Sequence, residues 1–425
     1  MADTSDDCFA PKTLAAAPPT GSLLRLEQAL LLLRERVSPV AGIEPRPLRA
    51  ALGAVLAADL VAPFAVPPAD NAAVDGFAVH FDDLLTDRET TLPVVGRVAA
   101  GHPLREAIVR GTAARIFTGA AMPAGADTVV MQEDCRLQGE RVIIAPGVRR
   151  GANYRRAGED LQRGDVALGA GRRLRPVDIG LAASLGATVL QVRRPLRVAL
   201  FSTGDELADP GDLLPPTGRY DSNRFALAAL LARQGADVTD LGILRDRKDD
   251  IAQALREAAP AHDLILTSGG VSVGEEDHVK AAVESSGRLH FWSLAIKPGR
   301  PVALGQVGRT AFVGLPGNSA AAVVTFVALV RPLLALLSGA TLGAPLSYPV
   351  TSGFAHRKKA GRQEWLRVSL AQAAQGWRAE RFPREGSGLL SSLSATDGFA
   401  ILDEDTTAVA PGDLLRFLPY TEVAA

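Results

Sequence analysis

Hydrophobic residues recur with different periods in successive parts of this chain, and each period predicts a kind of element. Near the start, the run LLRLEQALLLLRERV places Leu26, Leu30, Leu33 and Val37 on one side of a helix. A second, shorter helix is expected near Pro47–Ala58. The ordered part of the chain is therefore expected to open with helices, the first of which buries a leucine-rich face.

A β-rich module is predicted for residues 61–156. There, short apolar runs (LPVVGRV, ARIF, DTVVM, RVIIA) alternate with Gly, Pro and Asp turns. Residues 157–195 are mixed and include the helix RPVDIGLAASLG, with Pro176 in its first turn. We expect this segment to join residues 23–60 in one domain that carries the β-rich module as an insertion. Residues 1–22 are small, polar and proline-containing, and are expected to be disordered.

Residues 196–345 have a third rhythm, in which strand-length apolar runs alternate with longer helical segments. RVALFST and DLILTS predict buried strands, ADVTDLGIL predicts a strand, and KDDIAQALREAA predicts a helix. The helix in DSNRFALAALLARQG has three candidate N-caps: Asp221, Ser222 and Asn223. This alternation predicts a parallel, doubly wound sheet. Residues 346–425 show short strands and turns that predict a β-barrel or sandwich, of which we favour the barrel.

Length and composition set the class of protein. A chain of 425 residues is too long for one simple core, so about two to four domains are expected. The predicted fold is therefore multidomain, α/β plus β. Hydrophobic residues make up 47% and charged residues 22%, as in ordinary globular proteins. The formal net charge of -1 creates no field that would attract nucleic acid or an anionic membrane.

Cysteines, histidines and apolar stretches narrow the class further. Cys8 and Cys135 are too few for a disulfide framework or a thiolate zinc site, and the six histidines show no metal-ligand spacing. The N-terminus lacks the layout of a secretory signal. The apolar stretch Ala320–Val330 stops at Arg331 and is too short to cross a bilayer. We therefore expect a cytoplasmic protein without nucleic-acid or membrane partners.

Acids and glycines follow the predicted strands of residues 196–345, where ligands bind in open α/β sheets. Glu206 follows RVALFST, Asp246 follows LGILR, and Asp277 ends the loop TSGGVSVGEED. Carboxylates that meet in one crevice suit Mg²⁺, which also bridges to phosphates. Gly269 and Gly270 would let a phosphate approach backbone N–H groups. The cation explains how one loop can carry both a phosphate cradle and acids.

These acids can also be explained by a structural role, without any ligand. Asp and Glu at strand-to-helix junctions cap helices and complement the helix dipole, and Asp277 could do only that. The glycine loop matches neither the Walker A nor the Rossmann fingerprint. Spacing alone therefore predicts a magnesium–phosphate site and nothing more specific.

Eight segments together resemble the molybdopterin molybdenumtransferase family, which includes MoeA and, in animals, gephyrin. They occur in the family's order and cover nearly the whole chain beyond residue 22. The segments are PADNAAVDGFAV (68–79), FTGAAMPAGADTVVMQE (117–133), YRRAGED (154–160), FSTGDEL (201–207), YDSNR (220–224), TSGGVSVGEED (267–277), AIKPGRP (295–301) and GLPGN (314–318).

The resemblance implies an architecture and a reaction. It implies a homodimer of four-part subunits, with the active cleft between one subunit's α/β part and the other's β-rich insertion. The α/β part would resemble molybdopterin adenylyltransferase domains. The reaction implied is insertion of molybdate into adenylylated molybdopterin, with Mg²⁺-dependent release of AMP to form molybdenum cofactor. Molybdopterin adenylyltransferase and molybdoenzyme-maturation proteins are the protein partners that it suggests.

The resemblance also assigns roles to residues that match the family's motifs. The catalytic residues implied are Asp75, Asp160, Glu206, Asp246 and Lys297, and the metal ligands are Glu206, Asp246 and Asp277. The substrate-binding residues implied are Thr118, Arg155, Ser268, Gly269, Gly270, Val271, Ser272, Arg300, Pro316, Gly317, Asn318, Arg362 and Ser387. Taken alone, VDG before the strand GFAVH is better explained as a tight turn, and only the family motif distinguishes GED at 158–160 from a polar turn.

Two departures from the family pattern concern the oxyanion. Ser293 stands where many relatives have lysine, and Ser319-Ala320-Ala321 replaces the family's Pro-Val-Ser. Both lie where the resemblance places molybdate, so the choice between molybdate and tungstate is left open.

Two other functions are compatible with parts of this sequence. Adenylylation of molybdopterin needs a lone α/β domain, so the additional modules at 23–195 and 346–425 argue against it. A scaffold of the gephyrin kind would not need acids at Glu206, Asp246 and Asp277. A family member without activity is the third alternative.

Overall fold

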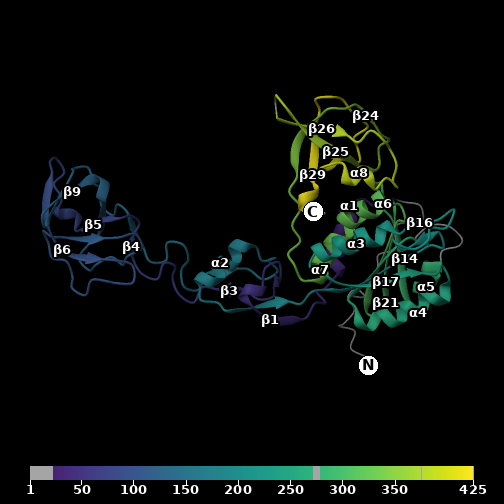
Figure 1. Ribbon diagram of the computed structural model, residues 1–425, viewed down its shortest axis with the longest axis horizontal. Helices are drawn as coiled ribbons and strands as arrows, with labels where there is room; N and C mark the ends of the chain where they lie inside the picture. Colours follow the sequence, from purple (N-terminus) through teal and green to yellow (C-terminus); the bar gives the residue numbers. More distant parts are fainter. Residues whose placement is uncertain (1–22, 271–277, 375, 425) are drawn as a thin grey trace. The chain divides into compact units, whose positions relative to one another are not determined.

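The computed structural model describes residues 23–270, 278–374 and 376–424. The chain forms two compact units, whose helices and strands are labelled in Figure 1. The larger contains the described residues among 1–57, 170–175 and 190–425, and the smaller contains 58–169 and 176–189. The finer domain boundaries expected from the sequence stay a prediction.

A six-stranded sheet forms the centre of the larger unit. Its order is β17 (Asp237–Leu244), β14 (Arg197–Thr203), β18 (Leu264–Ser268), β22 (Thr310–Leu315), β21 (Pro301–Val307) and β19 (Gly287–Ser293). The first four strands are parallel, but β22, β21 and β19 pair antiparallel. The expectation of an all-parallel sheet was wrong at this edge, because β21 and β22 are joined by a hairpin rather than by a crossover helix.

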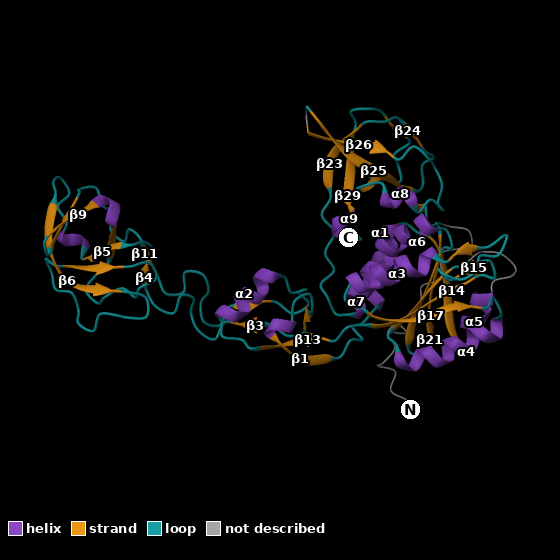
Figure 2. Cartoon of the chain, in the orientation of Figure 1, coloured by secondary structure: helices purple, strands orange, loops and turns teal. Residues whose placement is uncertain are grey.

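Alternate residues of the central strands contact two different hydrophobic clusters. Val198 and Leu200 of β14 pack on one side, and Ala199 and Phe201 pack on the other. The first cluster includes α1 (Leu26–Arg36), α3 (Ser222–Arg233), α6 (Ser319–Thr325) and α7 (Arg331–Leu337); the second includes α4 (Lys248–Ala258) and α5 (His278–Ser286). Helices therefore cover both faces, which confirms the doubly wound architecture (Figure 2).

The longest apolar helical run is a core element. Ser319–Leu337 passes from α6 through a π-helical turn, Phe326–Val330, into α7. It is 19 residues long and apolar enough to span a membrane, but 83% of its most apolar window is buried inside the protein. The expectation that the apolar run stops at Arg331 was wrong, because Arg331 is itself half-buried and the helix continues. Such a length and burial are typical of a core helix.

A closed five-stranded barrel forms the C-terminal part of the larger unit. Around the ring lie β25 (Gln363–Ala373), β26 (Gly376–Arg381), β23 (Tyr348–Ser352), β29 (Leu414–Pro419) and β27 (Gly398–Leu402), which pairs back onto β25. This confirms the barrel. The short strand β20 (Ile296–Lys297) pairs in parallel with the start of β25, so backbone pairing ties the α/β part to the barrel.

The segment between α1 and the smaller unit is mainly extended. β1 (Ile43–Pro47) and β2 (Val55–Leu56) flank β13 (Val189–Arg193) in a three-stranded sheet. The helix expected near Pro47–Ala58 is wrong: only the 3₁₀ turn Leu48–Ala50 forms. Gly53 then has a left-handed φ of 76°, and β2 bonds to β13 instead. Tertiary strand pairing therefore overrides the local helical pattern.

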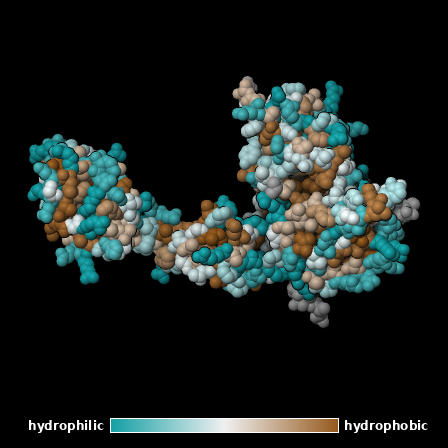
Figure 3. Space-filling model, in the orientation of Figure 1, coloured by the Kyte–Doolittle hydropathy of each residue, from teal (hydrophilic) through white to brown (hydrophobic). Residues whose placement is uncertain are grey.

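The smaller unit is built round a second six-stranded sheet. Its order is β8 (Thr128–Met131), β5 (Gly76–Val79), β7 (Ala113–Ile116), β6 (Thr90–Val98), β10 (Arg141–Ile144) and β9 (Cys135–Gln138). Two strand pairs and α2 (Pro176–Ser184) complete it: β11 (Tyr154–Arg155) with β4 (Asn71–Ala72), and β12 (Val166–Leu168) with β3 (Leu60–Val61). Hydrophobic and hydrophilic side chains are interspersed on the face shown in Figure 3.

Candidate functional site

The carboxyl ends of the parallel strands lie together at one edge of the α/β sheet. Thr203 of β14 is opposite Leu244 of β17, and Ser202 is opposite Ser268 of β18, which is opposite Leu315 of β22. The segments that follow these strand ends leave the sheet at this edge and contain Glu206, Asp246, Gly269, Gly270, Pro316 and Gly317. This arrangement follows from the parallel topology.

Gly269 and Gly270 turn the chain at this edge in a conformation that other residues would strain. Their φ angles are 94° and 64°, in the left-handed region. A Cβ on Gly269 would lie 2.9 Å from the carbonyl oxygen of Thr203, and one on Gly270 would lie 2.3 Å from Cγ2 of Val279. Both positions therefore require glycine, because the turn packs closely against Thr203 and Val279. Val271, Ser272 and Asp277 lie outside the described residues.

Asn223 links two of these strand ends, a role that its sequence position did not indicate. Its side-chain amide donates to Ser268 Oγ at 2.8 Å and to the Gly317 carbonyl at 2.9 Å. The N-cap of α3 is instead Asp221, whose carboxylate accepts from the Arg224 N–H. Of the three candidate caps, one therefore caps the helix and another holds the site together.

Glu206 and Asp246 follow neighbouring strands. The Glu206 carboxylate is ion-paired to Arg219 at 2.5 Å and lies so near Gly204 that a Cβ there would be 2.6 Å from Oε2. Asp246 is half-buried. Within the part of the chain that the structure describes, no group of three or more His, Cys, Asp or Glu is placed to hold a metal ion. Asp277, the third expected ligand, is outside that part.

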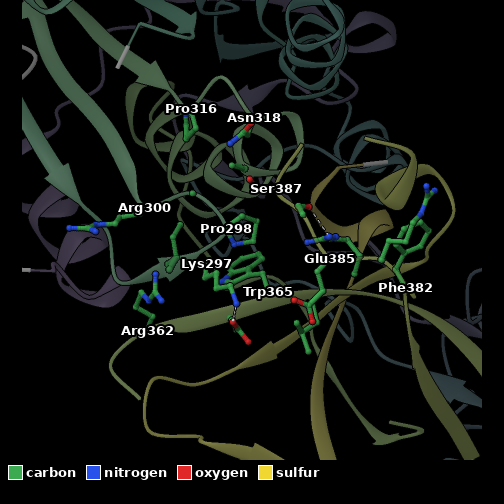
Figure 4. Close-up of a pocket in the computed structure, with 18 of the residues that line it drawn as sticks. Lys297, Pro298, Arg300, Pro316, Asn318, Arg362, Trp365, Phe382, Glu385 and Ser387 are labelled. Carbon is green, nitrogen blue, oxygen red and sulfur yellow. Dashed lines mark hydrogen bonds and ion pairs between the residues drawn. The ribbon is translucent and has the colours of Figure 1, made fainter. Parts of the chain in front are cut away.

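A cavity of about 360 Å³ lies where the α/β part meets the barrel (Figure 4). It is lined by six residues that the sequence had singled out: Lys297, Arg300, Pro316, Asn318, Arg362 and Ser387. The first four come from the α/β part and the last two from the barrel. The structure therefore brings residues 90 positions apart in the chain, from Lys297 to Ser387, into one hollow.

Positive charge dominates this hollow, which we call the cationic cavity. Six cationic side chains line it, against the two carboxylates of Glu364 and Glu385: Lys297, Arg300, Arg362, Arg367, Arg381 and Arg384. Guanidinium and ammonium groups bind oxyanions through charge-assisted hydrogen bonds. The cavity is therefore suited to a small anion with several oxygens.

Glu364 is the buried acid of the cationic cavity. Its side chain is 5% exposed and accepts contacts from the Lys297 ammonium and from His356 Nε2, the latter at 2.5 Å. Burial would raise the pKa of Glu364, but the hydrogen bonds from Lys297 and His356 outweigh it and hold the pKa below its ordinary value. Glu364 is therefore ionised, and it holds the Lys297 ammonium by an ion pair.

Two contacts of the loop 384–388 hold one wall of the cavity. Buried Arg367 donates to Ser392 Oγ at 3.1 Å and to the Gly386 carbonyl at 3.0 Å. The Ser387 carbonyl accepts from the first N–H groups of α6, those of Ala320 at 2.9 Å and Ala321 at 3.3 Å. These helix N–H groups have no partner within their own helix. Ser387 therefore caps α6 and fixes the barrel loop at the cavity.

The remaining expected site residues belong to the smaller unit. The Asp75 carboxylate accepts hydrogen bonds from Thr118 N at 2.8 Å and Thr118 Oγ1 at 2.7 Å. Arg155 lies in β11 opposite Asn71 and is exposed, and the N–H of Asp160 donates to the Val66 carbonyl. The structure thus brings Asp75 and Thr118 together; a shared cleft with the α/β part stays a prediction.

Several cavity residues were missed from the sequence. They are His356, Glu364, Trp365, Arg367, Arg381, Arg384 and Glu385. A signal existed for Glu364 and Arg367: Glu364 begins the strand-like run EWLRVSL, Arg367 interrupts it, and a buried charge needs a partner. His356 carried no such signal. Of the family departures, Ala321 lines the cavity and Ser293 ends β19.

Comparison with protein families places three regions of the chain. Residues 24–186 match the MoeA N-terminal region (domain I and II), residues 199–336 a probable molybdopterin binding domain, and residues 349–420 the MoeA C-terminal region (domain IV). The matched regions follow one another along nearly the whole described chain.

Whole-length relatives agree with these matches. The chain is 37% identical over 404 residues to a molybdopterin molybdenumtransferase of Haemophilus influenzae, covering 94% of this chain and all of the relative. It is 33% identical to the enzyme of that name in Nostoc, with 95% and 94% covered. The solved structure of a molybdopterin biosynthesis MoeA protein from Pyrococcus horikoshii matches with a TM-score of 0.80 at 28% identity, covering 94% of this chain and all of that one. This chain belongs to the MoeA family of molybdopterin molybdenumtransferases.

Proposed function

We propose that this protein inserts molybdate into adenylylated molybdopterin, with Mg²⁺-dependent release of AMP to form molybdenum cofactor. The observation that carries the proposal is the cationic cavity, in a chain of this family, beside strand ends that carry a glycine turn and two acids. Such a layout supplies one place for an oxyanion and another for a phosphate ester.

Molybdate, a substrate here, would bind in the cationic cavity. It is a tetrahedral dianion, and Lys297, Arg300 and Arg362 can each meet it with N–H donors. Apolar atoms of Pro298 and Trp365 also line the cavity and lower the local dielectric, so the attraction is stronger than in bulk water.

The adenylylated molybdopterin would lie across the strand ends. Backbone N–H groups at the turn Ser268, Gly269 and Gly270 would meet a phosphate, and Asn223 keeps Ser268 next to Gly317. Cleavage breaks one P–O bond of the phosphoanhydride as water adds to phosphorus, and AMP leaves. The dithiolene sulfurs take no part in that cleavage; as two thiols they then bind molybdenum, and their two protons leave with one oxo group of molybdate as one water.

Glu206 and Asp246 would hold the Mg²⁺, and we propose Asp277 as its third protein ligand. Their fit rests on chemistry: both described acids offer hard oxygen donors after neighbouring strands, and Mg²⁺ prefers carboxylate oxygens and water. The metal would supply neutralisation of pyrophosphate charge. For Glu206 to bind it, the carboxylate must exchange its Arg219 partner.

The proposal also includes a homodimer in the cytoplasm. In it, Asp75, Thr118, Arg155 and Asp160 of the smaller unit would complete the partner subunit's site. Molybdopterin adenylyltransferase would supply the adenylylated substrate, and molybdoenzyme-maturation proteins would take the product.

The test uses purified full-length protein with adenylylated molybdopterin, molybdate and Mg²⁺, and measures AMP and molybdenum cofactor by chromatography. Wild type should form both, and Glu206→Ala or Asp246→Ala should slow AMP release about 100-fold, as expected for loss of a charge-stabilising group. Asp212→Ala, which removes an exposed acid six positions after Glu206, is the control.

Three results would contradict the proposal. Undiminished cofactor synthesis by both acid variants would remove Glu206 and Asp246 from the reaction. Net formation of adenylylated product from ATP would indicate an adenylyltransferase. Failure of soluble protein to restore molybdoenzyme activity in a deficient cell would favour a scaffold or an inactive relative.

A further inference from the structure

A chain of polar contacts runs through the barrel to Lys297 in the cationic cavity. Glu385 Oε1 accepts from Arg381 Nη2 at 3.0 Å, and Arg381 Nη1 lies 2.7 Å from His356 Nδ1. His356 Nε2 lies 2.5 Å from one oxygen of Glu364, whose other oxygen is ion-paired to Lys297. The middle of this series of contacts is shielded from water, since the side chains of His356 and Glu364 are 8% and 5% exposed.

The hydrogen bonds in this series of contacts can each have only one donor. A guanidinium has N–H donors and no acceptor, so Arg381 must donate to His356 Nδ1. His356 is therefore the neutral tautomer with its proton on Nε2, and it donates to Glu364. Each oxygen of Glu364 thus has its own donor, as a buried carboxylate requires.

The position of Lys297 depends on that carboxylate. Strand pairing sets the Lys297 backbone opposite Glu364, but a lysine has four flexible side-chain bonds and its side chain is 51% exposed. The ion pair with Glu364 holds the ammonium against the cavity wall. Since an ammonium has three donors and Glu364 takes one, two remain for an oxyanion.

We propose that His356 is a positioning residue for Lys297: it orients the Glu364 carboxylate, which in turn holds the ammonium for a tetrahedral oxyanion. This inference rests on the proposed function, in which that oxyanion is molybdate. His356 itself does not touch the anion; without it, one oxygen of Glu364 loses its partner and the carboxylate can rotate away from Lys297.

The experiment compares His356→Leu, Lys297→Ala and the double variant in the full-length protein, by the KM for molybdate and by kcat. His356→Leu should raise the KM about tenfold, a loss typical of a misplaced binding group, with kcat within about twofold. The double variant should be no worse than Lys297→Ala, because His356 acts through Lys297. His356→Gln should recover most of the affinity, since its amide can accept from Arg381 and donate to Glu364.

Controls separate positioning from folding. His262→Leu removes a histidine of the same unit that is also bonded at both ring nitrogens, to Ala258 and Thr239, and it should leave the KM unchanged. Thermal melting checks that each variant is folded. His356→Asn, which is polar but too short to reach both partners, replaces the leucine variant if that one is insoluble.

The outcomes distinguish this inference from the proposed function. A folded His356→Leu protein with the wild-type KM, or a double variant whose losses multiply, overturns the role of His356. In either case Lys297→Ala still raises the KM and the molybdate site stands. If Lys297→Ala itself leaves the KM unchanged, the proposed molybdate site fails, and the inference fails with it.

Discussion

Asp75 and Thr118 are joined by two hydrogen bonds, because both the backbone N–H and the hydroxyl of Thr118 donate to one carboxylate oxygen. These residues are 43 positions apart and meet beside the first turn after β7. The backbone bond from Thr118 is the largest cause of the lowered pKa of Asp75, and the hydroxyl bond is the next. Asp75 therefore stays ionised at lower pH than an ordinary aspartate.

Thr118→Val should raise the pKa of Asp75 part of the way to its ordinary value, since the backbone bond remains. Because a lowered carboxyl pKa favours the ionised form above it, the variant should lose activity at a higher pH than wild type on the acid side. Carboxyl NMR titration and the pH–rate profile measure this. Thr118→Ser keeps the hydroxyl and should behave as wild type; equal profiles for valine and serine would contradict the role of the bond.

Arg362→Ala should weaken molybdate binding about tenfold, or about 1.4 kcal/mol, because one cationic donor of the cavity is lost. The loss should shrink as salt rises, since mobile ions screen the same charge. Isothermal titration with molybdate at two ionic strengths measures both effects. Arg378→Ala, an exposed arginine of the same barrel paired to Glu380, is the control. Equal losses in both variants would show that the effect is not local to the cavity.

Gly270→Ala should disrupt the strand-end turn. The new Cβ would lie 2.3 Å from Val279 Cγ2 and 2.8 Å from Thr203 Oγ1, at a φ of 64° that already strains an alanine. We expect about 2 kcal/mol or more of destabilisation from strain and overpacking, together with weaker binding of the adenylylated substrate. Gly308→Ala has a similar φ of 58° with open space around its Cβ, so it reports backbone strain alone. Chemical denaturation compares the free energies of unfolding of the two variants. Equal losses would show that contact with Val279 and Thr203 does not contribute.

Asp263→Asn should destabilise the larger unit by about 3 kcal/mol, because it leaves Arg194 without its buried partner. Burial opposes ionisation of Asp263, but hydrogen bonds from Arg194 and from the Arg197 backbone hold its pKa below the ordinary value. A lowered carboxyl pKa gives stability that is present above the unfolded pKa and lost as pH falls through the folded one. The difference between wild type and variant should therefore shrink in acid.

Denaturation at pH 7 and below pH 4, the ordinary range of an aspartate, measures that difference. The matched control is Asp403→Asn, which breaks the exposed pair with Arg416 and should cost less than about 1 kcal/mol. A pH-independent difference for Asp263→Asn would mean that packing, rather than charge, is responsible.

The local pattern of hydrophobic residues predicted the elements correctly wherever the buried side chains recur with the helical or strand period. Leu33 and Val37 are buried as the helical period predicts, and Leu26 and Leu30 pack beside them. The period failed at Pro47–Ala58, where pairing with β13 competes with helix formation. The expected stop of the apolar stretch at Arg331 also failed, because α7 continues from Arg331 to Leu337 in the core. Both errors have one cause: partners distant in sequence changed the local outcome.

From its sequence alone, this protein is determined to be a multidomain α/β plus β chain with acids and glycines after successive strands, because parallel strands bring their carboxyl ends to one edge. Only the tertiary structure decided where the cationic cavity lies. Its walls come from the α/β part and from the barrel, joined by the pairing of Lys297 with Glu364. Its buried acid is paired with Lys297 of the α/β part, and its histidine contacts Arg381 and Glu364 within the barrel. No local period of hydrophobic residues encodes these contacts.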